Sequence, residues 1–344
     1  MKLKKFHFIQ AFYKLEKDFL KQILIQFSWI ILAFSSSTIT HHELQITDPL
    51  QKTYEWELKD IPFFDELIVS WNAFRPSQGF YLISTSLYTT QWSAWLPYAA
   101  WHKDKQKSFN VTDNASNISS FQDIVVCPNV SKAKKLRIRI EAIDHATLKN
   151  FFCLHICTTL GTPIFNKEAS PMRVNPLNIS PLSQMTLDHP RFADLCSPTS
   201  TTATIRYLTQ TNTLQATHFA QHVYDHAFDI YGNWSFSVAQ AFVELGKAWR
   251  GWVARFTSFN QIIAQLKNNC PIVVSLKGPL KGSAQTYQSG HLVVIRGYHA
   301  QNREFLCMDP AFSLDSDTFI AYEEEDFLQA WERRGFVGYC FARH

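Results

Sequence analysis

The segment Asp194-Leu195-Cys196-Ser197-Pro198-Thr199-Ser200 decides the fold of the second half of this chain, because a short loop here runs into a predicted helix. Proline is favoured in the first turn of a helix, where its missing N–H costs no hydrogen bond. The pattern predicts a helix over residues 198–208 with Cys196 at its start. The exposed N–H groups and the dipole of a helix start favour an anion, and they lower the pKa of a thiol placed there.

The sequence after Cys196 predicts helices followed by an antiparallel sheet. Further helices are expected over residues 217–229, 235–245 and 258–269. Strands are expected over residues 271–276, 291–298, 304–308, 319–322 and 336–341, with a short helix over 324–333 before the last one. This order indicates an α+β domain over residues 183–344.

A predicted hairpin brings His291 and Asp309 together. The strands at residues 291–298 and 304–308 are joined by turn-like residues 299–303, so the numbers of facing residues sum to roughly 600. His291 then lies opposite or diagonal to Asp309, and cross-strand neighbours are about 4.5–5.5 Å apart. A carboxylate there would orient the imidazole and stabilise its charged form. With Cys196, the pair predicts a Cys–His–Asp triad for nucleophilic thiol chemistry.

The first half of the chain reads as strands. Residues 66–71, 81–88, 135–142 and 151–158 are apolar, β-branched or alternating runs. We therefore expect a β-sandwich-like domain over residues 41–165, with a loop at residues 110–120, which are rich in Asn, Ser and Thr. The three prolines between residues 166 and 182 predict a linker there.

Residues 1–40 differ from the rest. Lysines open the chain, an apolar run covers residues 22–34, and three serines follow. This order resembles a secretory signal, and the apolar run is short for a transmembrane helix. If residues 19–37 act as a signal or anchor, the protein is secreted or membrane-associated, and otherwise it is cytoplasmic. An amphipathic surface helix is the alternative. Membrane association is expected only through residues 1–40.

Composition excludes several classes of protein. The chain has 344 residues, of which 46% are hydrophobic and 18% charged, so general disorder is excluded and two domains are expected. The net charge of +4 comes without a basic stripe, so no nucleic-acid partner is expected. The seven cysteines are an odd number and contain no CxxC pair, so at least one thiol is expected to be free or to pair between chains, and a dense disulfide scaffold is not expected.

Several segments together resemble the peptidase C39-like family of papain-fold cysteine peptidases. They are Gln184, residues 195–200, 223–225, 231–236 and 290–294, and Asp309-Pro310. The resemblance covers residues 184–343. Residues 64–72 and 91–93 also resemble the β-rich region that precedes this domain in some members.

The resemblance implies a papain-like domain and assigns a role to each site residue. Cys196 would be the nucleophile, His291 the general base and acid, and Asp309 the residue that orients His291. Gln184 would supply a side-chain N–H to the oxyanion hole, with the backbone N–H of Cys196 as second donor. A peptide or protein would be the substrate, hydrolysed through a thioester, with no cofactor and no metal. The chain has no transporter segment, so the paired-glycine substrate of bacteriocin-processing members is not carried over.

Two alternatives to the peptidase remain open on sequence alone. The same thioester could pass its acyl group to an amine, as in transglutaminases and arylamine acetyltransferases. A non-catalytic binding protein would instead use the β-sandwich to contact a surface glycan or a partner.

Three other clusters have both a functional and a structural interpretation. His218, His222 and His226 recur at helical spacing and could chelate a metal, but a solvated or partner-facing helix side is favoured. Core packing is favoured over ligand binding for Trp92, Trp95 and Trp101, and over metal or redox chemistry for residues 153–157 (Cys153, His155 and Cys157).

Overall fold

The computed structural model describes residues 38–128, 131–167 and 173–344. The segment 19–37, where a signal or anchor is expected, lies outside these residues. These described residues form one compact unit. Among the described residues, no helix is both long enough and apolar enough to cross a bilayer.

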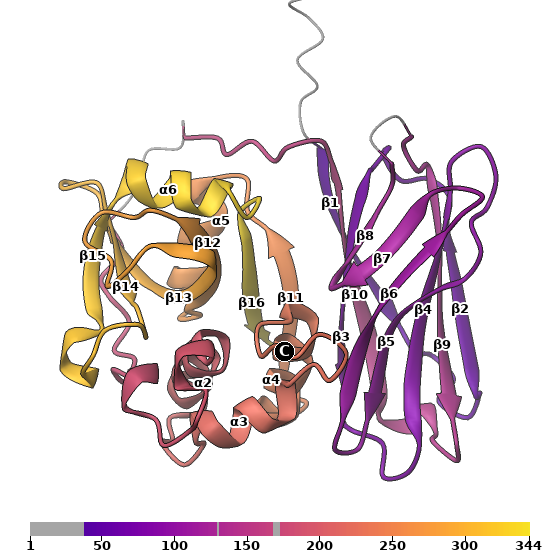
Figure 1. Cartoon of the computed structure of the whole chain (residues 1–344), viewed down its shortest axis with the longest axis horizontal. Helices are drawn as coiled ribbons and strands as arrows, with labels where there is room; N and C mark the ends of the chain where they lie inside the picture. Colours follow the sequence, from indigo (N-terminus) through magenta and orange to yellow (C-terminus); the bar gives the residue numbers. More distant parts are fainter. Residues whose placement is uncertain (1–37, 129–130, 168–172) are drawn as a thin grey trace, which may run out of the picture. The chain divides into compact units, whose positions relative to one another are not determined.

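The N-terminal sheet is antiparallel and, in the described residues, has ten strands (Figure 1). Their spatial order is β1-β10-β3-β8-β7-β6-β5-β4-β9-β2. The strands are β1 (Thr38–Gln45), β2 (Thr53–Leu58), β3 (Glu66–Ala73), β4 (Phe80–Tyr88), β5 (Leu96–His102), β6 (Gln106–Asp113), β7 (Ile118–Gln122), β8 (Ile124–Val126), β9 (Lys135–Ile143) and β10 (Phe151–Leu160). The short 3₁₀ helix η1 (Leu148–Asn150) precedes β10. The β-rich region predicted before the second half is therefore present.

The predicted loop over residues 110–120 is wrong. β6 and β7 pair through this segment, with Val111 facing Ser120, and Asn117 supplies the left-handed turn at φ 55°. Asparagine tolerates this conformation better than most residues. The loop was predicted because the segment is rich in polar residues. These residues are compatible with a strand, since β6 exposes alternate side chains to solvent and those positions need no apolar residue.

Strand β3 is buried along nearly its whole length because helix α4 and strand β11 of the second half pack against it. The ring of Trp71 on β3 makes edge contacts with Trp101 on β5 and Phe236 on α4, at centroid distances of 5.6 and 5.9 Å. Both halves of the described chain thus share one apolar core, which explains why β3 reads as a continuous apolar run rather than an alternating one.

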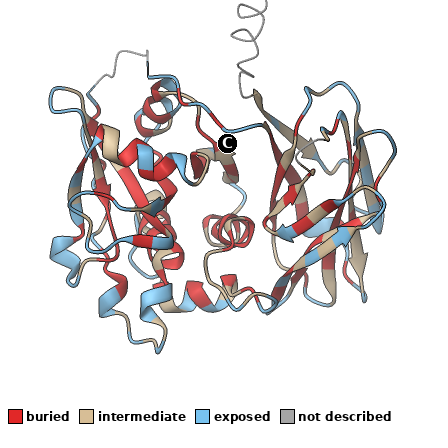
Figure 2. Cartoon of the chain, turned by 45° about the horizontal axis from the view of Figure 1, so that its top comes forward, coloured by how far each residue is buried: buried red, intermediate tan, exposed pale blue. Residues whose placement is uncertain are grey.

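The C-terminal sheet is antiparallel and, in the part of the chain that is described, has six strands in the order β11-β16-β12-β13-β14-β15. The strands are β11 (Trp249–Arg255), β12 (Ile272–Gly278), β13 (Tyr287–His299), β14 (Glu304–Met308), β15 (Phe319–Glu323) and β16 (Val337–Arg343). The α-helices are α2 (Cys196–Thr209), α3 (Ala216–Val223), α4 (Trp234–Leu245), α5 (Phe259–Lys267) and α6 (Glu324–Glu332). Short 3₁₀ helices are η2 (Gln184–Thr186), η3 (Phe192–Asp194) and η4 (Asp315–Asp317). Figure 2 shows buried residues along the strands and the inner helix faces, and exposed residues mainly in the connections.

The structure differs from the prediction at two places in this half, the end of one helix and an additional strand. α3 ends at Val223 rather than residue 229, because the buried side chain of Asp225 accepts a hydrogen bond from the N–H of Ala227 and closes a turn there. β11 was not predicted and interrupts the expected order of helices first and sheet after. It follows Gly246, whose φ of 74° ends α4, and it pairs with β16, the last strand of the chain.

The expected linker contains no helix or multi-residue strand in its described residues, 166–167 and 173–182. It makes single bridges from Asn166 to Ser258 and from Val174 to Tyr298. The chain therefore runs along the C-terminal sheet before it reaches η2.

Candidate active site

Helix α2 places Cys196 at the start of its first turn. In the preceding 3₁₀ helix η3, the N–H of Leu195 donates a hydrogen bond to the carbonyl of Phe192. The first hydrogen bond of α2 follows, from the N–H of Thr199 to the carbonyl of Leu195. The hydroxyl of Ser197 lies 2.9 Å from Ser237 Oγ on α4. Because the N–H groups of a first turn have no partner within the helix, they are available to a thiolate or an oxyanion.

Strand β13 carries His291, and Asp309 follows β14 directly. The Nε2 atom of His291 lies 2.7 Å from Oδ1 of Asp309. The hairpin register pairs Val294 with Met308, and a bulge between Ile295 and Gly297 separates this register from that near the turn. The diagonal placement of His291 and Asp309 expected from the hairpin is therefore present.

The Asp309 carboxylate is fully buried and held from four directions. Besides His291, it accepts hydrogen bonds on Oδ2 from the hydroxyls of Tyr287 at 2.5 Å and Tyr322 at 2.6 Å, and on Oδ1 from the N–H of Ala311 at 2.9 Å. Burial alone would raise the pKa of Asp309, but the charge and hydrogen bond of His291 and the two tyrosine hydroxyls bring it below its usual value. The carboxylate is thus ionised where it faces the imidazole.

Neither tyrosine was identified from the sequence. Tyr287 opens β13, four residues ahead of the predicted strand, where Gln288, Ser289 and Gly290 hide the strand pattern. Tyr322 lies on β15 opposite Phe305, at the far side of a second hairpin. Tyr322 is separated from His291 by strand β14, and no regular spacing along the sequence predicts a contact across two hairpins.

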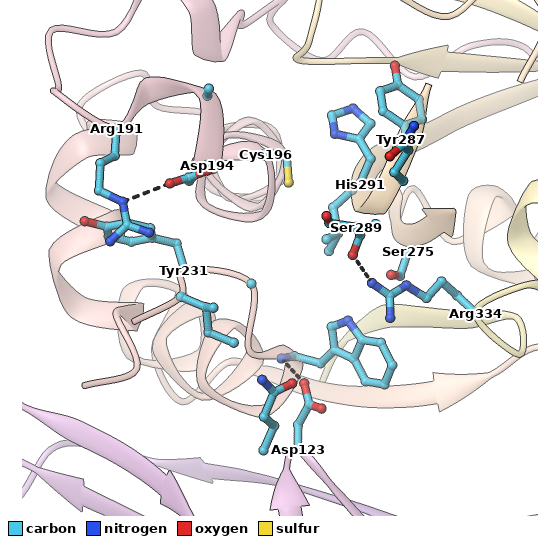
Figure 3. Close-up of a pocket in the computed structure, with 18 of the residues that line it drawn as sticks. Asp123, Arg191, Asp194, Cys196, Tyr231, Ser275, Tyr287, Ser289, His291 and Arg334 are labelled. Carbon is cyan, nitrogen blue, oxygen red and sulfur yellow. Dashed lines mark hydrogen bonds and ion pairs between the residues drawn. The ribbon is translucent and has the colours of Figure 1, made fainter. Parts of the chain in front are cut away.

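The Cys196 thiol and the His291 imidazole both line one pocket (Figure 3), and each shifts the pKa of the other. Burial alone would raise the pKa of Cys196, but the hydrogen bond and charge of His291, and backbone hydrogen bonds with Leu292 and Ser197, lower it below the usual 9.0. Burial alone would lower the pKa of His291, but Asp309 and Cys196 raise it above the usual 6.5. The pair is therefore biased toward thiolate and imidazolium.

In the other cysteines the pKa of the thiol is raised rather than lowered. All seven cysteines lie in the described residues and are free thiols. Burial raises the pKa of each of the six others, which are Cys127, Cys153, Cys157, Cys270, Cys307 and Cys340. Only Cys196 among them is both partly accessible and shifted toward the thiolate.

A pocket of about 690 Å³ opens onto Cys196 and His291 (Figure 3). Its walls come from both sheets, because residues 121–124 at the β7–β8 turn line it together with Ser275 on β12 and Tyr287 on β13. Tyr231, Trp234 and Arg334 also line it. The N–H of Trp234 donates to Asp123 at 2.8 Å, and burial raises the pKa of Asp123 to about 6. Residues of the N-terminal sheet therefore line the same pocket as Cys196.

Gln184 lies on η2, buried behind the nucleophile rather than in the pocket wall. Its Nε2 donates to the carbonyls of Ala193 at 2.7 Å and Phe192 at 3.2 Å. Its Oε1 is buried and has no hydrogen-bond partner among the described residues. In this structure Gln184 holds η3 ahead of Cys196, and its predicted role in the oxyanion hole stays a prediction.

The three histidines at helical spacing do not form a common face. The rings of His218 and His222 contact each other in a tilted arrangement, with centroids 4.5 Å apart. α3 ends before His226, whose Nδ1 lies 3.1 Å from the carbonyl of Gln106. Within the described ranges, no group of three or more His, Cys, Asp or Glu side chains is arranged to hold a metal ion.

The tryptophan cluster divides between core and surface. Trp101 and Tyr98 are buried, whereas Trp92 and Trp95 are partly exposed and stack with Arg137 at 3.9 Å and Arg139 at 4.4 Å, respectively.

The third cluster, in residues 153–157, is buried. Cys153, His155 and Cys157 all lie in the core, with His155 Nε2 at 3.4 Å from Asn72 Oδ1 and 3.5 Å from Cys153 Sγ. The cluster belongs to the packing between strands β3 and β10.

Comparison with known proteins gives one match. Residues 176–339 match the model of the Peptidase_C39 like family, a range that contains Gln184, Cys196, His291 and Asp309. A β-rich region precedes the matched residues. No curated protein and no solved structure matches the chain.

Proposed function

We propose that this chain, whose residues 176–339 match the Peptidase_C39-like family, is a cysteine peptidase that hydrolyses amide bonds through Cys196. The observation that carries the proposal is the series Cys196–His291–Asp309. Cys196 and His291 line one pocket, His291 Nε2 lies 2.7 Å from Asp309 Oδ1, and the pKa of the thiol is shifted downward and that of the imidazole upward. A family match at residues 176–339 points to peptidase chemistry, and this series supplies the groups that such chemistry requires.

The proposed reaction has two steps. The Cys196 thiolate attacks the amide carbonyl, and the tetrahedral oxyanion that forms collapses when His291 gives its proton to the departing amine, leaving a thioester. His291 then takes a proton from water, whose oxygen attacks the thioester, and the carboxylic acid leaves with the thiolate restored. Asp309 keeps the imidazole oriented in both steps.

We assign the stabilisation of the oxyanion to the start of α2. The backbone N–H of Cys196 belongs to the first turn, where N–H groups have no partner inside the helix. We assign Gln184 to two tasks. It holds η3 through Phe192 and Ala193 in the free protein, and it supplies a second donor when one of these hydrogen bonds is exchanged for the substrate oxygen.

We also propose finer architectural assignments. Residues 183–344 would have a papain-like arrangement, supported by the packing of α2, with its nucleophile, against β13, with its histidine. Residues 41–165 would form a β-sandwich-like domain, supported by the ten antiparallel strands, and residues 166–182 would connect the two.

Thiol reactivity tests the proposal before any substrate is known. Iodoacetamide labelling is followed against pH in the native protein, with mass spectrometry locating the label, and in Cys196→Ala and His291→Gln. We expect fast labelling of Cys196 well below pH 9.0, slowed in His291→Gln, while the six buried cysteines serve as internal controls. Labelling of Cys196 no faster than those controls would overturn the proposal and favour a binding protein. Once a substrate is found, an added amine that appears in its products would show acyl transfer instead of hydrolysis.

A further inference from the structure

The guanidinium of Arg334 lies in the pocket beside His291. Arg334 follows α6, and two hydrogen bonds hold its backbone. Its N–H donates to the carbonyl of Trp331 at 2.9 Å, and its carbonyl accepts a hydrogen bond from Arg255 Nη1 at 3.1 Å. Its Nη2 donates to the carbonyl of Ser289. Figure 3 shows the side chain extending into the pocket toward Ser289, on the side that carries His291.

The backbone next to His291 makes room for this guanidinium. Gly290 has a φ of 110°, and a Cβ at that position would lie 2.1 Å from Nη2 of Arg334. A residue with a side chain would therefore displace the guanidinium or strain the strand. The glycine immediately before the histidine and the arginine at the end of α6 thus fit one another, which fixes a cation against the wall of the pocket.

The charge of Arg334 is not neutralised within the pocket. The other arginine of the lining, Arg191, is paired with Asp194 at 2.8 Å and with Asp229. Asp123 attracts Arg334 through space, but its carboxylate accepts the N–H of Trp234. Arg334 forms no ion pair among the described residues, and its buried Nε has no hydrogen-bond partner among them.

We propose that Arg334 binds a carboxylate of the substrate, which deepens the proposed peptidase function and rests on it. Guanidinium and carboxylate match in charge and in planar geometry. His291 donates its proton to the departing amine, so a group beside His291 contacts the leaving part of the peptide. The carboxylate is then either an acidic side chain next to the cleaved bond or the free C-terminus of a short leaving segment.

Two pairs of alkylating probes separate these sources of the carboxylate. Iodoacetyl-glycine and iodoacetyl-glycinamide differ in a terminal carboxylate, and iodoacetyl-glutamine amide and iodoacetyl-glutamate amide differ in a side-chain one. In each reaction the Cys196 sulfur forms a bond to the methylene carbon and iodide leaves. We expect the acidic member of one pair to label Cys196 about tenfold faster, the effect of one charge-assisted hydrogen bond.

Substitution of Arg334 identifies the group responsible. In Arg334→Gln, the rate ratio within the preferred pair is expected to fall close to one while labelling by iodoacetamide persists, and Arg334→Lys is expected to retain part of the ratio. High salt should reduce the ratio in the native protein, a readout that needs no variant. Equal labelling by both members of both pairs, or a ratio unchanged in folded Arg334→Gln, would overturn the proposal. Slow labelling by iodoacetamide itself would instead overturn the peptidase function.

Discussion

The ring of Tyr287 stacks on the imidazole of His291 at 3.9 Å between centroids, and its hydroxyl donates to Asp309 at 2.5 Å. One side chain therefore orients both members of the pair that supports the Cys196 thiolate. Tyr322 donates to the same oxygen of Asp309 from another strand. The two tyrosine hydroxyls stabilise the negative charge of Asp309, and this charge stabilises the imidazolium form of His291.

Replacing Tyr287 with Phe should narrow the pH range of the thiolate–imidazolium pair. The ring still stacks, but Asp309 loses one hydrogen bond to its charged form, so the pKa of His291 falls and that of Cys196 rises. We expect a decrease of about tenfold in the labelling rate of Cys196 at pH 6, and a larger one when Tyr322→Phe is added. Tyr287→Leu, which also removes the stacking, should lower the rate further. A labelling profile of Tyr287→Phe identical to that of the native protein would contradict this role.

Asp309→Asn should collapse the pH range of activity. In the native protein the rate rises as pH passes the lowered pKa of Cys196 and falls as pH passes the raised pKa of His291. Without the carboxylate charge both pKa values return toward 9.0 and 6.5, so the imidazolium is lost before the thiolate forms. We expect kcat/KM to fall about 10²- to 10⁴-fold once a substrate is found. Asp317→Asn, an exposed change on η4, is the matched control. Equal losses in both variants would point to folding rather than chemistry.

The sequence could locate the His291–Asp309 pair because a hairpin turn determines which residues face each other. The bulge at Ile295 and Gly297 moves the register, but a diagonal contact tolerates this shift. The meeting of Cys196 with His291 had no such local origin, since it depends on the packing of α2 against β13.

Other parts of the site depend on tertiary contacts that leave no periodic pattern. Tyr322 and Arg334 reach the site from separate elements, and Asp123 comes from the N-terminal sheet. Residues 287–290, which lack an apolar strand pattern, extend β13 beside β12, with Gly278 facing Tyr287. Local propensity therefore predicted most helices and strands of the second half, β11 excepted, and missed the tertiary contacts between them.

His155 should make the protein less stable in mild acid. It is buried, and burial followed by the charges of His41 and Arg250 lowers its pKa from 6.5 to about 3. The unfolded chain therefore binds a proton that the folded one does not, so stability is full above pH 6.5 and falls as pH drops toward 3. Between pH 6.5 and 5 this loss is at most about 2 kcal/mol. Urea unfolding at both pH values should show a smaller difference for His155→Gln than for the native protein, and an equal difference would rule out His155 as the source.

Asp225→Asn should destabilise the contact between the two sheets. The Asp225 carboxylate is fully buried and accepts hydrogen bonds from the N–H and hydroxyl of Ser108 on β6 and from the side chain of Asn233, which caps α4. An asparagine would turn an NH₂ group toward some of these donors, leaving buried groups without partners. We expect the free energy of unfolding to fall by about 2–3 kcal/mol in urea titrations. Asp229→Asn removes an exposed ion pair with Arg191 and should leave the free energy of unfolding nearly unchanged. Because Trp234 follows Asn233 and lines the pocket, Asp225→Asn should also slow the labelling of Cys196 by the iodoacetyl peptides more than by iodoacetamide. Unchanged stability would show that water or a rotated amide satisfies the same donors.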